Sequence, residues 1–89
     1  MYQIQKGLII QKIDKETVIF DAEESMLYTL NETAAEIFKM IKKGLKEDEI
    51  IEGMLKKYQV KKERVEKDVK DLISELEKKG IITDGKKGI

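Results

Sequence analysis

The chain has 89 residues, of which 40% are hydrophobic and 40% charged, and its 18 basic residues balance 18 acidic ones. This length fits a single domain with one compact core. A net charge of zero disfavours a nucleic-acid binder that depends on a basic surface. Because the sequence has no Cys and no His, it lacks a thiolate nucleophile, the usual general base and the commonest metal ligands. We therefore expect no enzyme activity, no metal and no cofactor.

The start of the chain shows no targeting segment. Met1–Gly7 is mostly polar, and no apolar run in the chain exceeds three residues. A membrane span needs about 20 apolar residues. The sequence therefore predicts a cytoplasmic protein without a membrane contact.

The first third of the chain alternates in hydrophobicity with a period of two, which is typical of strands. We predict strands at Leu8–Ile13, Thr17–Asp21 and Ser25–Leu30, separated by short polar gaps. Short connections between consecutive strands favour an antiparallel meander.

The period changes at Asn31, a residue type that caps helix N-termini. A first helix is expected from there to a stop at Gly44, a second at about Lys46–Tyr58, and a third at about Lys61–Lys79 with Gly80 after its end. Apolar residues at helical spacing mark the buried faces. In the three helices these are Ala34, Ile37, Phe38, Ile41; Ile50, Ile51, Met54, Leu55, Tyr58; and Val65, Val69, Leu72, Leu76, broadened by Ile73.

This order predicts an α+β domain that resembles a winged helix-turn-helix, with a three-stranded antiparallel sheet followed by three helices. Ile81-Ile82 is expected to add a short strand or to pack beneath the last helix, and Thr83 begins a stretch rich in Gly and Lys. We place one domain at residues 1–83 and a flexible tail at 84–89.

Two features are candidates for function. The strand ending at Leu30 carries neither charge nor Pro over Met26–Leu30, although edge strands usually carry one. It is either a central or covered strand, or an edge that accepts an extended peptide. The third helix has two polar flanks, which either bind a ligand or are solvated ion-pair faces, and periodicity does not show which flank meets the sheet. The first flank consists of Lys61, Arg64, Asp68, Asp71 and Glu75, and the second consists of Lys62, Glu66, Lys70 and Glu77.

The stretch from Val18 to Ile82 resembles PqqD-like proteins, the peptide-recognition modules of pathways that modify ribosomally made peptides. The first matching block runs from Val18-Ile19-Phe20-Asp21 through Ser25–Leu30 to Phe38, with Leu30-Asn31-Glu32 as its most specific piece. The second block is Glu49–Val60, and the third is Val65, Asp68-Val69, Leu72-Ile73, Leu76 and Gly80–Ile82. The sequence departs from the family at Ser25, where a turn Gly is common, and at Phe38, where Trp is common.

The resemblance implies a domain without catalysis of its own that binds the leader segment of a precursor peptide as an added strand. It implies presentation of that peptide to a modifying enzyme, either of the radical S-adenosylmethionine type or a leader protease. Carried onto this chain, the site lies between the strand Ser25–Leu30 and the helical stretch Arg64–Glu75. The expected peptide-binding residues are Ser25, Met26, Leu27, Tyr28, Thr29, Leu30, Arg64, Val65, Asp68, Asp71, Leu72 and Glu75.

Two other functions remain open. A small winged-helix DNA-binding regulator would have the same layout, but the third helix interleaves seven basic with six acidic residues, and those acids would lie near phosphates. An oligomerisation domain would pair the open strand edge with its own copy, so we expect a monomer or a weak dimer.

Overall fold

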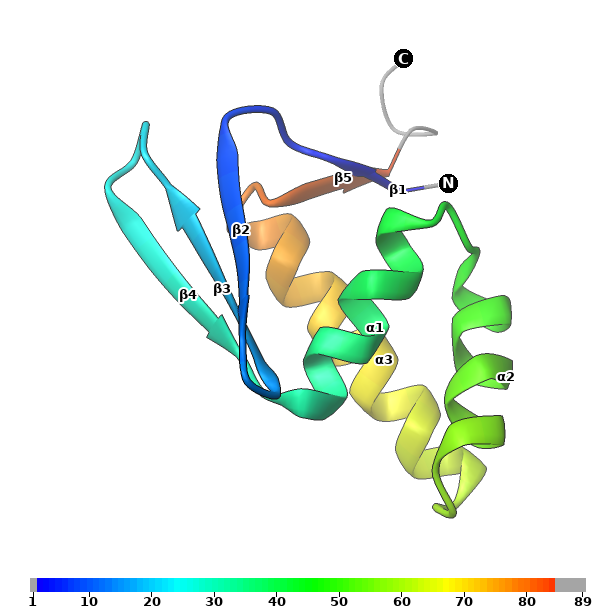
Figure 1. Ribbon diagram of the computed structural model, residues 1–89. Coiled ribbons are helices and arrows are strands. Elements are labelled where there is room, and N and C mark those ends of the chain that lie inside the picture. Colours follow the sequence, from blue (N-terminus) through cyan, green and yellow to red (C-terminus); the bar gives the residue numbers. More distant parts are fainter. Residues whose placement is uncertain (1, 85–89) are drawn as a thin grey trace.

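The computed structural model describes residues 2–84 (Figure 1). These residues form two small antiparallel sheets and three helices. In chain order the elements are β1 (Tyr2–Ile4), β2 (Leu8–Ile13), β3 (Glu16–Asp21), β4 (Met26–Leu30), α1 (Glu32–Lys42), α2 (Glu47–Lys57), α3 (Lys62–Lys78) and β5 (Ile82–Asp84). The expected α+β fold, with a three-stranded sheet followed by three helices, is confirmed.

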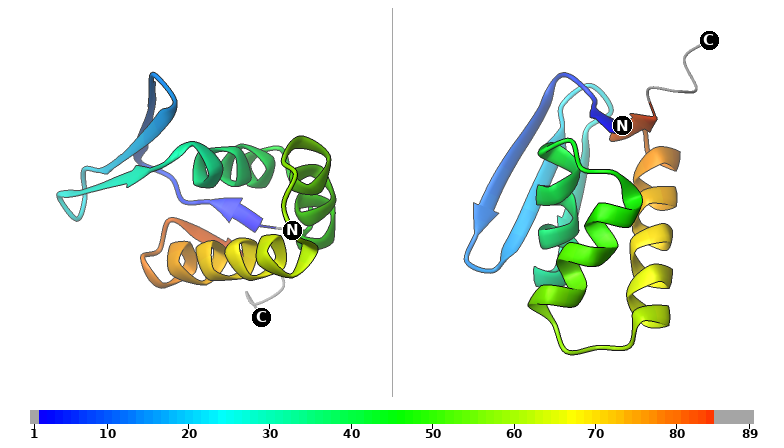
Figure 2. Two further views of the ribbon diagram at one scale, coloured as in Figure 1. Left: turned by 90° about the horizontal axis from the view of Figure 1, so that it is seen from below. Right: turned by 90° about the vertical axis from the view of Figure 1, so that its right-hand side faces the viewer.

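The larger sheet has the order β2-β3-β4, so β4 lies at one edge and β2 at the other. Its register places Ile10, Ile19 and Tyr28 opposite one another, and these residues share the face that packs on the helices. Ile19 is fully buried on this face, whereas Ile9 and Leu27 on the opposite face are more than half exposed. One side of the sheet therefore contributes to the core and the other faces solvent (Figure 2).

Local signals account for the helix boundaries. Asn31 caps α1, because its side-chain oxygen accepts the backbone N–H of Ala34 at 2.9 Å. Gly44 after α1 and Gly80 after α3 have φ angles of 86° and 73°, a left-handed conformation that favours glycine. The acidic residues 47–49 lie in the first turn of α2, where the helix dipole favours negative charge.

β1 pairs with β5, which brings the two ends of the described chain together (Figure 1). Of the two outcomes expected for Ile81-Ile82, the structure shows a strand beginning at Ile82, and both residues are essentially inaccessible to solvent. β1 was not predicted, because three residues are too few to show a period and the partner strand is at the far end of the chain. β5 extends through Thr83 to Asp84, the first residue of the expected tail; residues 85–89 lie outside the described part.

The core is formed by the inner faces of the helices, by β3 and β4, and by the start of β5. Fourteen hydrophobic side chains of residues 2–84 are buried there, Phe38 and Ile37 being among the largest. On α3 the buried line is Val65, Val69, Ile73 and Leu76, whereas Leu72, expected in the core, is partly exposed. None of the helices in residues 2–84 has both the length and the apolar character needed to cross a bilayer.

Candidate functional site

β4 is an edge strand, and nothing within residues 2–84 pairs with its outer side. The interpretation of this segment as a central strand is therefore wrong. Its side chains alternate: Tyr28 and Leu30 turn inward, and Leu27 is 62% exposed. Because an unpaired edge presents a row of free N–H and C=O groups, β4 is able to template another strand.

A cleft of about 350 Å³ lies between β4 and the C-terminal half of α3. Buried Leu30, Leu76 and Ile81 contribute apolar surface to it, and Leu72 adds a partly exposed side chain. The complete lining is Leu27, Tyr28, Thr29, Leu30, Asn31, Ala34, Leu72, Glu75, Leu76, Lys79 and Ile81. A cleft with both apolar and polar lining beside an open strand edge is suited to holding an extended chain with at least one apolar side chain.

Two charged residues of α3 border the cleft, and they neutralise each other. The Nζ atom of Lys79 lies 2.6 Å from Oε1 of Glu75, one helical turn earlier. The same ammonium group lies 4.9 Å from the centre of the Tyr28 ring in β4, which is within cation–π range. Lys79 thus links the two walls of the cleft.

The structure brings half of the predicted site residues together around this cleft. Leu27, Tyr28, Thr29 and Leu30 line it from β4, and Leu72 and Glu75 line it from α3. Periodicity left undecided which flank of α3 faces the sheet. Of the residues on the two flanks, Glu75 lines this cleft, so the flank that reaches the sheet is the one that contains Glu75.

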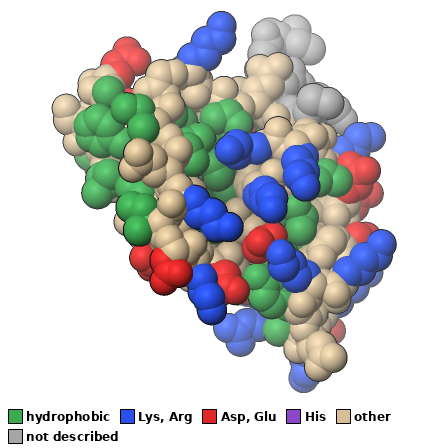
Figure 3. Space-filling view, in the orientation of Figure 1, with side chains coloured by type: hydrophobic (Ala, Val, Ile, Leu, Met, Phe, Trp, Pro, Cys, Tyr) green, Lys and Arg blue, Asp and Glu red, His purple; other side chains and the backbone are tan. Residues whose placement is uncertain are grey.

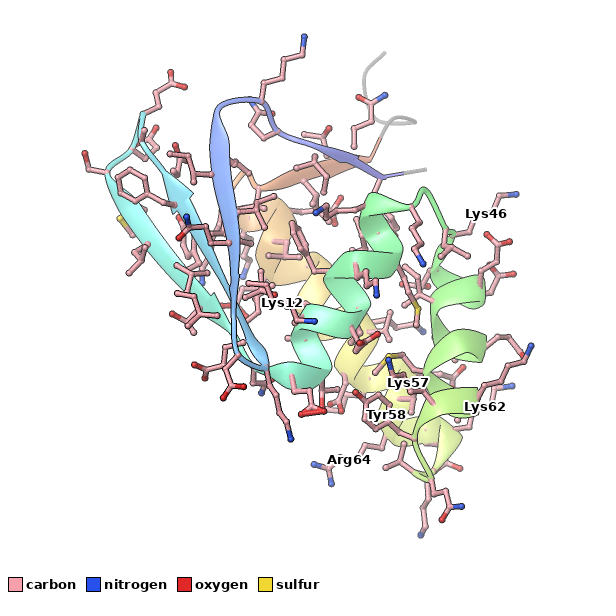
Figure 4. All side chains as sticks on the ribbon, in the orientation of Figure 1. Lys12, Lys46, Lys57, Tyr58, Lys62 and Arg64 are labelled. Carbon is pink, nitrogen blue, oxygen red and sulfur yellow. The ribbon has the colours of Figure 1, made fainter. Side chains whose placement is uncertain are left out.

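The remaining predicted residues lie elsewhere. Arg64, Val65 and Asp68 border a second, smaller cavity of about 160 Å³ near the N-terminal end of α3, together with Thr33, Met54, Tyr58 and Val60. Arg64 extends away from the body of the domain (Figure 4), with its Nε atom 3.9 Å from a carboxylate oxygen of Asp68.

Asp71, Ser25 and Met26 do not line either of these cavities. Asp71 is exposed and forms an ion pair with Lys67 at 3.4 Å, so it belongs to the solvated face of α3. Ser25 precedes β4 in the turn, with a φ of 55°, and Met26 begins the strand with 46% of its surface exposed.

Five residues of the cleft were not predicted as site residues: Asn31, Ala34, Leu76, Lys79 and Ile81. Lys79 had a readable signal, because it follows Leu72 and Glu75 at helical spacing on the same side of α3. Asn31 and Ala34 had none, since the strand-to-helix junction enters the cleft only through the tertiary arrangement. Among the described residues there is no group of three or more Asp and Glu side chains placed to hold a metal ion.

The sequence model of the family described as coenzyme PQQ synthesis protein D (PqqD) matches residues 16–82. The chain belongs to the PqqD family. This confirms the resemblance seen over Val18–Ile82, and the match runs from the start of β3 to the first residue of β5. Both walls of the cleft are therefore family elements. No curated protein matches the chain.

Two solved structures share the fold of this PqqD-family chain. One is described as "TbiB1 in Complex with the TbiA(beta) Leader Peptide"; it is 22% identical, with a TM-score of 0.84, over 98% of this chain and 96% of that one. The other is described as "Lasso peptide synthetase B1 complexed with the leader peptide"; it is 20% identical, with a TM-score of 0.85, over 93% of this chain and 98% of that one. The likeness covers nearly the whole chain in each case and establishes the same fold.

Proposed function

We propose that this protein is a peptide-binding adaptor that takes the leader segment of a ribosomally made precursor peptide as an added strand along β4. The observation that carries the proposal is the open edge of β4 beside a partly apolar cleft formed with α3. The two proteins of the same fold are described as leader-peptide complexes, which supports the same class of ligand here.

The cleft supplies two kinds of interaction. Main-chain hydrogen bonds to β4 give an affinity that depends little on the peptide sequence. The part of the cleft lined by Leu72 gives selectivity for an apolar side chain. The ion pair of Glu75 and Lys79 borders the cleft and adds polar groups with which a leader side chain can form hydrogen bonds.

We assign the chemistry of the pathway to a partner enzyme, either a radical S-adenosylmethionine enzyme or a leader protease, to which the adaptor presents its peptide. The ionisable groups of the cleft beyond the Tyr28 phenol are one carboxylate and one ammonium group, and these two are already bound to each other. Such a site is built to hold a chain rather than to activate a nucleophile.

The structure gives no observation that favours DNA binding. Three ion pairs along α3, at Arg64–Asp68, Lys67–Asp71 and Glu75–Lys79, neutralise charges that a recognition helix would direct at phosphates.

The decisive experiment is an NMR titration with synthetic leader peptides encoded next to this gene. We expect amide shifts concentrated in β4 and in α3 from Leu72 to Lys78. A matched pair of variants tests the pocket: Leu72→Ala should weaken binding by about tenfold, because one buried leucine contributes about 1.5 kcal/mol or more, whereas Ile9→Ala on the outer sheet face should leave affinity unchanged. Binding without shifts in β4 and α3 would contradict the proposal.

Strand addition has a further signature in the peptide. Successive N–H groups of an added strand point alternately toward β4 and away from it. N-methylation along the leader should therefore reduce affinity at every second position of the bound segment.

Light scattering with and without leader separates this function from self-association, since a stable dimer unaffected by the leader would indicate that β4 pairs with its own copy.

A further inference from the structure

A second groove, of about 430 Å³, lies on the other side of α1 from the cleft, between that helix and the β2–β3 hairpin. Its apolar lining residues are Ile10 and Ala35, which are half-buried, and Phe38, which is buried. Ala34 lines the cleft whereas Ala35 lines this groove, so the two sites share a helix but no lining residue.

The groove carries an excess of unpaired positive charge. Lys12 and Lys15 from the hairpin and Lys39 and Lys42 from α1 line it. Within the described part of the chain, none of these four lysines forms a salt bridge. Figure 3 shows lysine side chains gathered over the middle of this face, and Figure 4 shows Lys12 extending from β2 toward α1.

One carboxylate of the groove is already neutralised from outside it. Nζ of Lys57, from α2, lies 2.8 Å from Oε1 of Glu36. That hydrogen bond lowers the pKa of the Glu36 carboxyl, and the charges of Lys39 and Lys12 lower it further. The lining therefore keeps four ammonium groups against two carboxylates, Asp14 and Glu32, that have no salt bridge of their own.

Helix electrostatics explain only part of this cluster. Lys39 and Lys42 lie in the last turn of α1, where the helix dipole favours cations. Lys12 and Lys15 belong to a separate segment, and the fold brings them to the same groove without a counter-ion. Like charges that converge beside exposed apolar surface favour the binding of a ligand that carries both acidic and apolar groups.

We propose that this groove docks an acidic segment of a partner protein, with carboxylates that meet the four lysines and an apolar side chain between them that contacts Ile10 and Ala35. A polypeptide fits better than a nucleic acid for two reasons. The apolar lining residues make no favourable contact with a phosphate backbone, and Asp14 and Glu32 would repel a continuous row of phosphates. This proposal does not depend on leader binding at β4.

The test uses a fluorescein-labelled peptide in which Leu-Phe is flanked on each side by two Glu residues, and a control peptide with Gln in place of Glu. We expect the Glu peptide to bind at low salt at least tenfold more tightly than the Gln peptide, with amide shifts in the hairpin and α1. Lys39→Glu with Lys42→Glu should weaken binding at least tenfold, and the charge-matched Lys70→Glu with Lys78→Glu on α3 by less than twofold.

If Lys39→Glu with Lys42→Glu fails to fold, Lys12→Gln with Lys15→Gln provides a second variant of the groove that leaves α1 unchanged. Leu72→Ala should bind the Glu peptide normally, which separates this groove from the cleft. Four results would overturn the proposal. They are no binding at millimolar peptide, equal binding of the two peptides, tighter binding of an oligo-dT strand with the same dependence on Lys39 and Lys42, and amide shifts confined to β4 and α3.

Discussion

The ammonium group of Lys79 at the end of α3 lies 4.9 Å above the ring of Tyr28 in β4. This contact joins the two walls of the cleft between β4 and α3 directly, and Glu75 holds the ammonium group in place from the preceding turn.

Removing that contact should loosen the cleft. We expect a coupling energy of about 0.5–1 kcal/mol between Lys79→Met and Tyr28→Leu, because exposed cation–π pairs contribute that much. Urea unfolding of the two single variants and the double variant measures it. Lys78→Met, one residue earlier, serves as the control, and strictly additive effects of Lys79→Met and Tyr28→Leu would show that the two side chains do not interact energetically.

Ser25 has a φ of 55° in the turn before β4, a conformation that is costly for residues other than glycine. We expect Ser25→Gly to stabilise the fold by about 0.5–1 kcal/mol, since glycine relieves that strain but loses more chain entropy on folding. Thermal or urea unfolding checks this. A loss of stability would mean that the Ser25 side chain contributes more than its backbone strain costs.

Gly53 lies in the middle of α2, where alanine favours the helix by about 1 kcal/mol. A Cβ atom there would lie 3.0 Å from both Sδ and Cε of Met40. Because that thioether end is flexible, we expect it to move and Gly53→Ala to stabilise the domain by about 0.5 kcal/mol. The gain should be larger in a Met40→Ala background. An equal gain in stability in both backgrounds would show that the contact with Met40 does not reduce the effect of Gly53→Ala.

Glu36 should make stability depend on pH. Its pKa is lowered from 4.5, mainly by the hydrogen bond from Lys57. The folded state therefore gains stability above the unfolded pKa and loses it as the pH falls through the lower folded value. We expect Glu36→Gln to reduce the free energy of unfolding at pH 7 but to make little difference at about pH 3. Glu52→Gln, on exposed helix surface, is the control; an equal deficit at both pH values would assign the effect of Glu36→Gln to packing.

Much of the fold could be predicted because its signals are local. Asn31, Gly44 and Gly80 mark helix ends through backbone chemistry that acts within a few residues, and these predictions agree with the structure. The β1–β5 pair could not be predicted, because it depends on contacts between segments at opposite ends of the chain.

The site was predictable only in part for a related reason. Periodicity identifies which residues share a side of α3, but not which side faces β4. Leu72 was expected both in the core and at the site, and Arg64 and Asp71 on the binding flank, because helical spacing does not show where the packed interface ends. The structure turns Leu72 into the cleft and leaves Asp71 on the solvated face.

The pairing of Tyr2 with Asp84 places the two ends of the described chain on adjacent strands, on the same side of the molecule (Figure 1). A short linker between them would close the backbone into a ring, and a new start could then be cut between β2 and β3 without breaking a helix. By the same geometry, the domain is suited to insertion into a surface loop of another protein. The two residues of the host loop that flank the inserted domain would have to lie apart by little more than the spacing of adjacent strands.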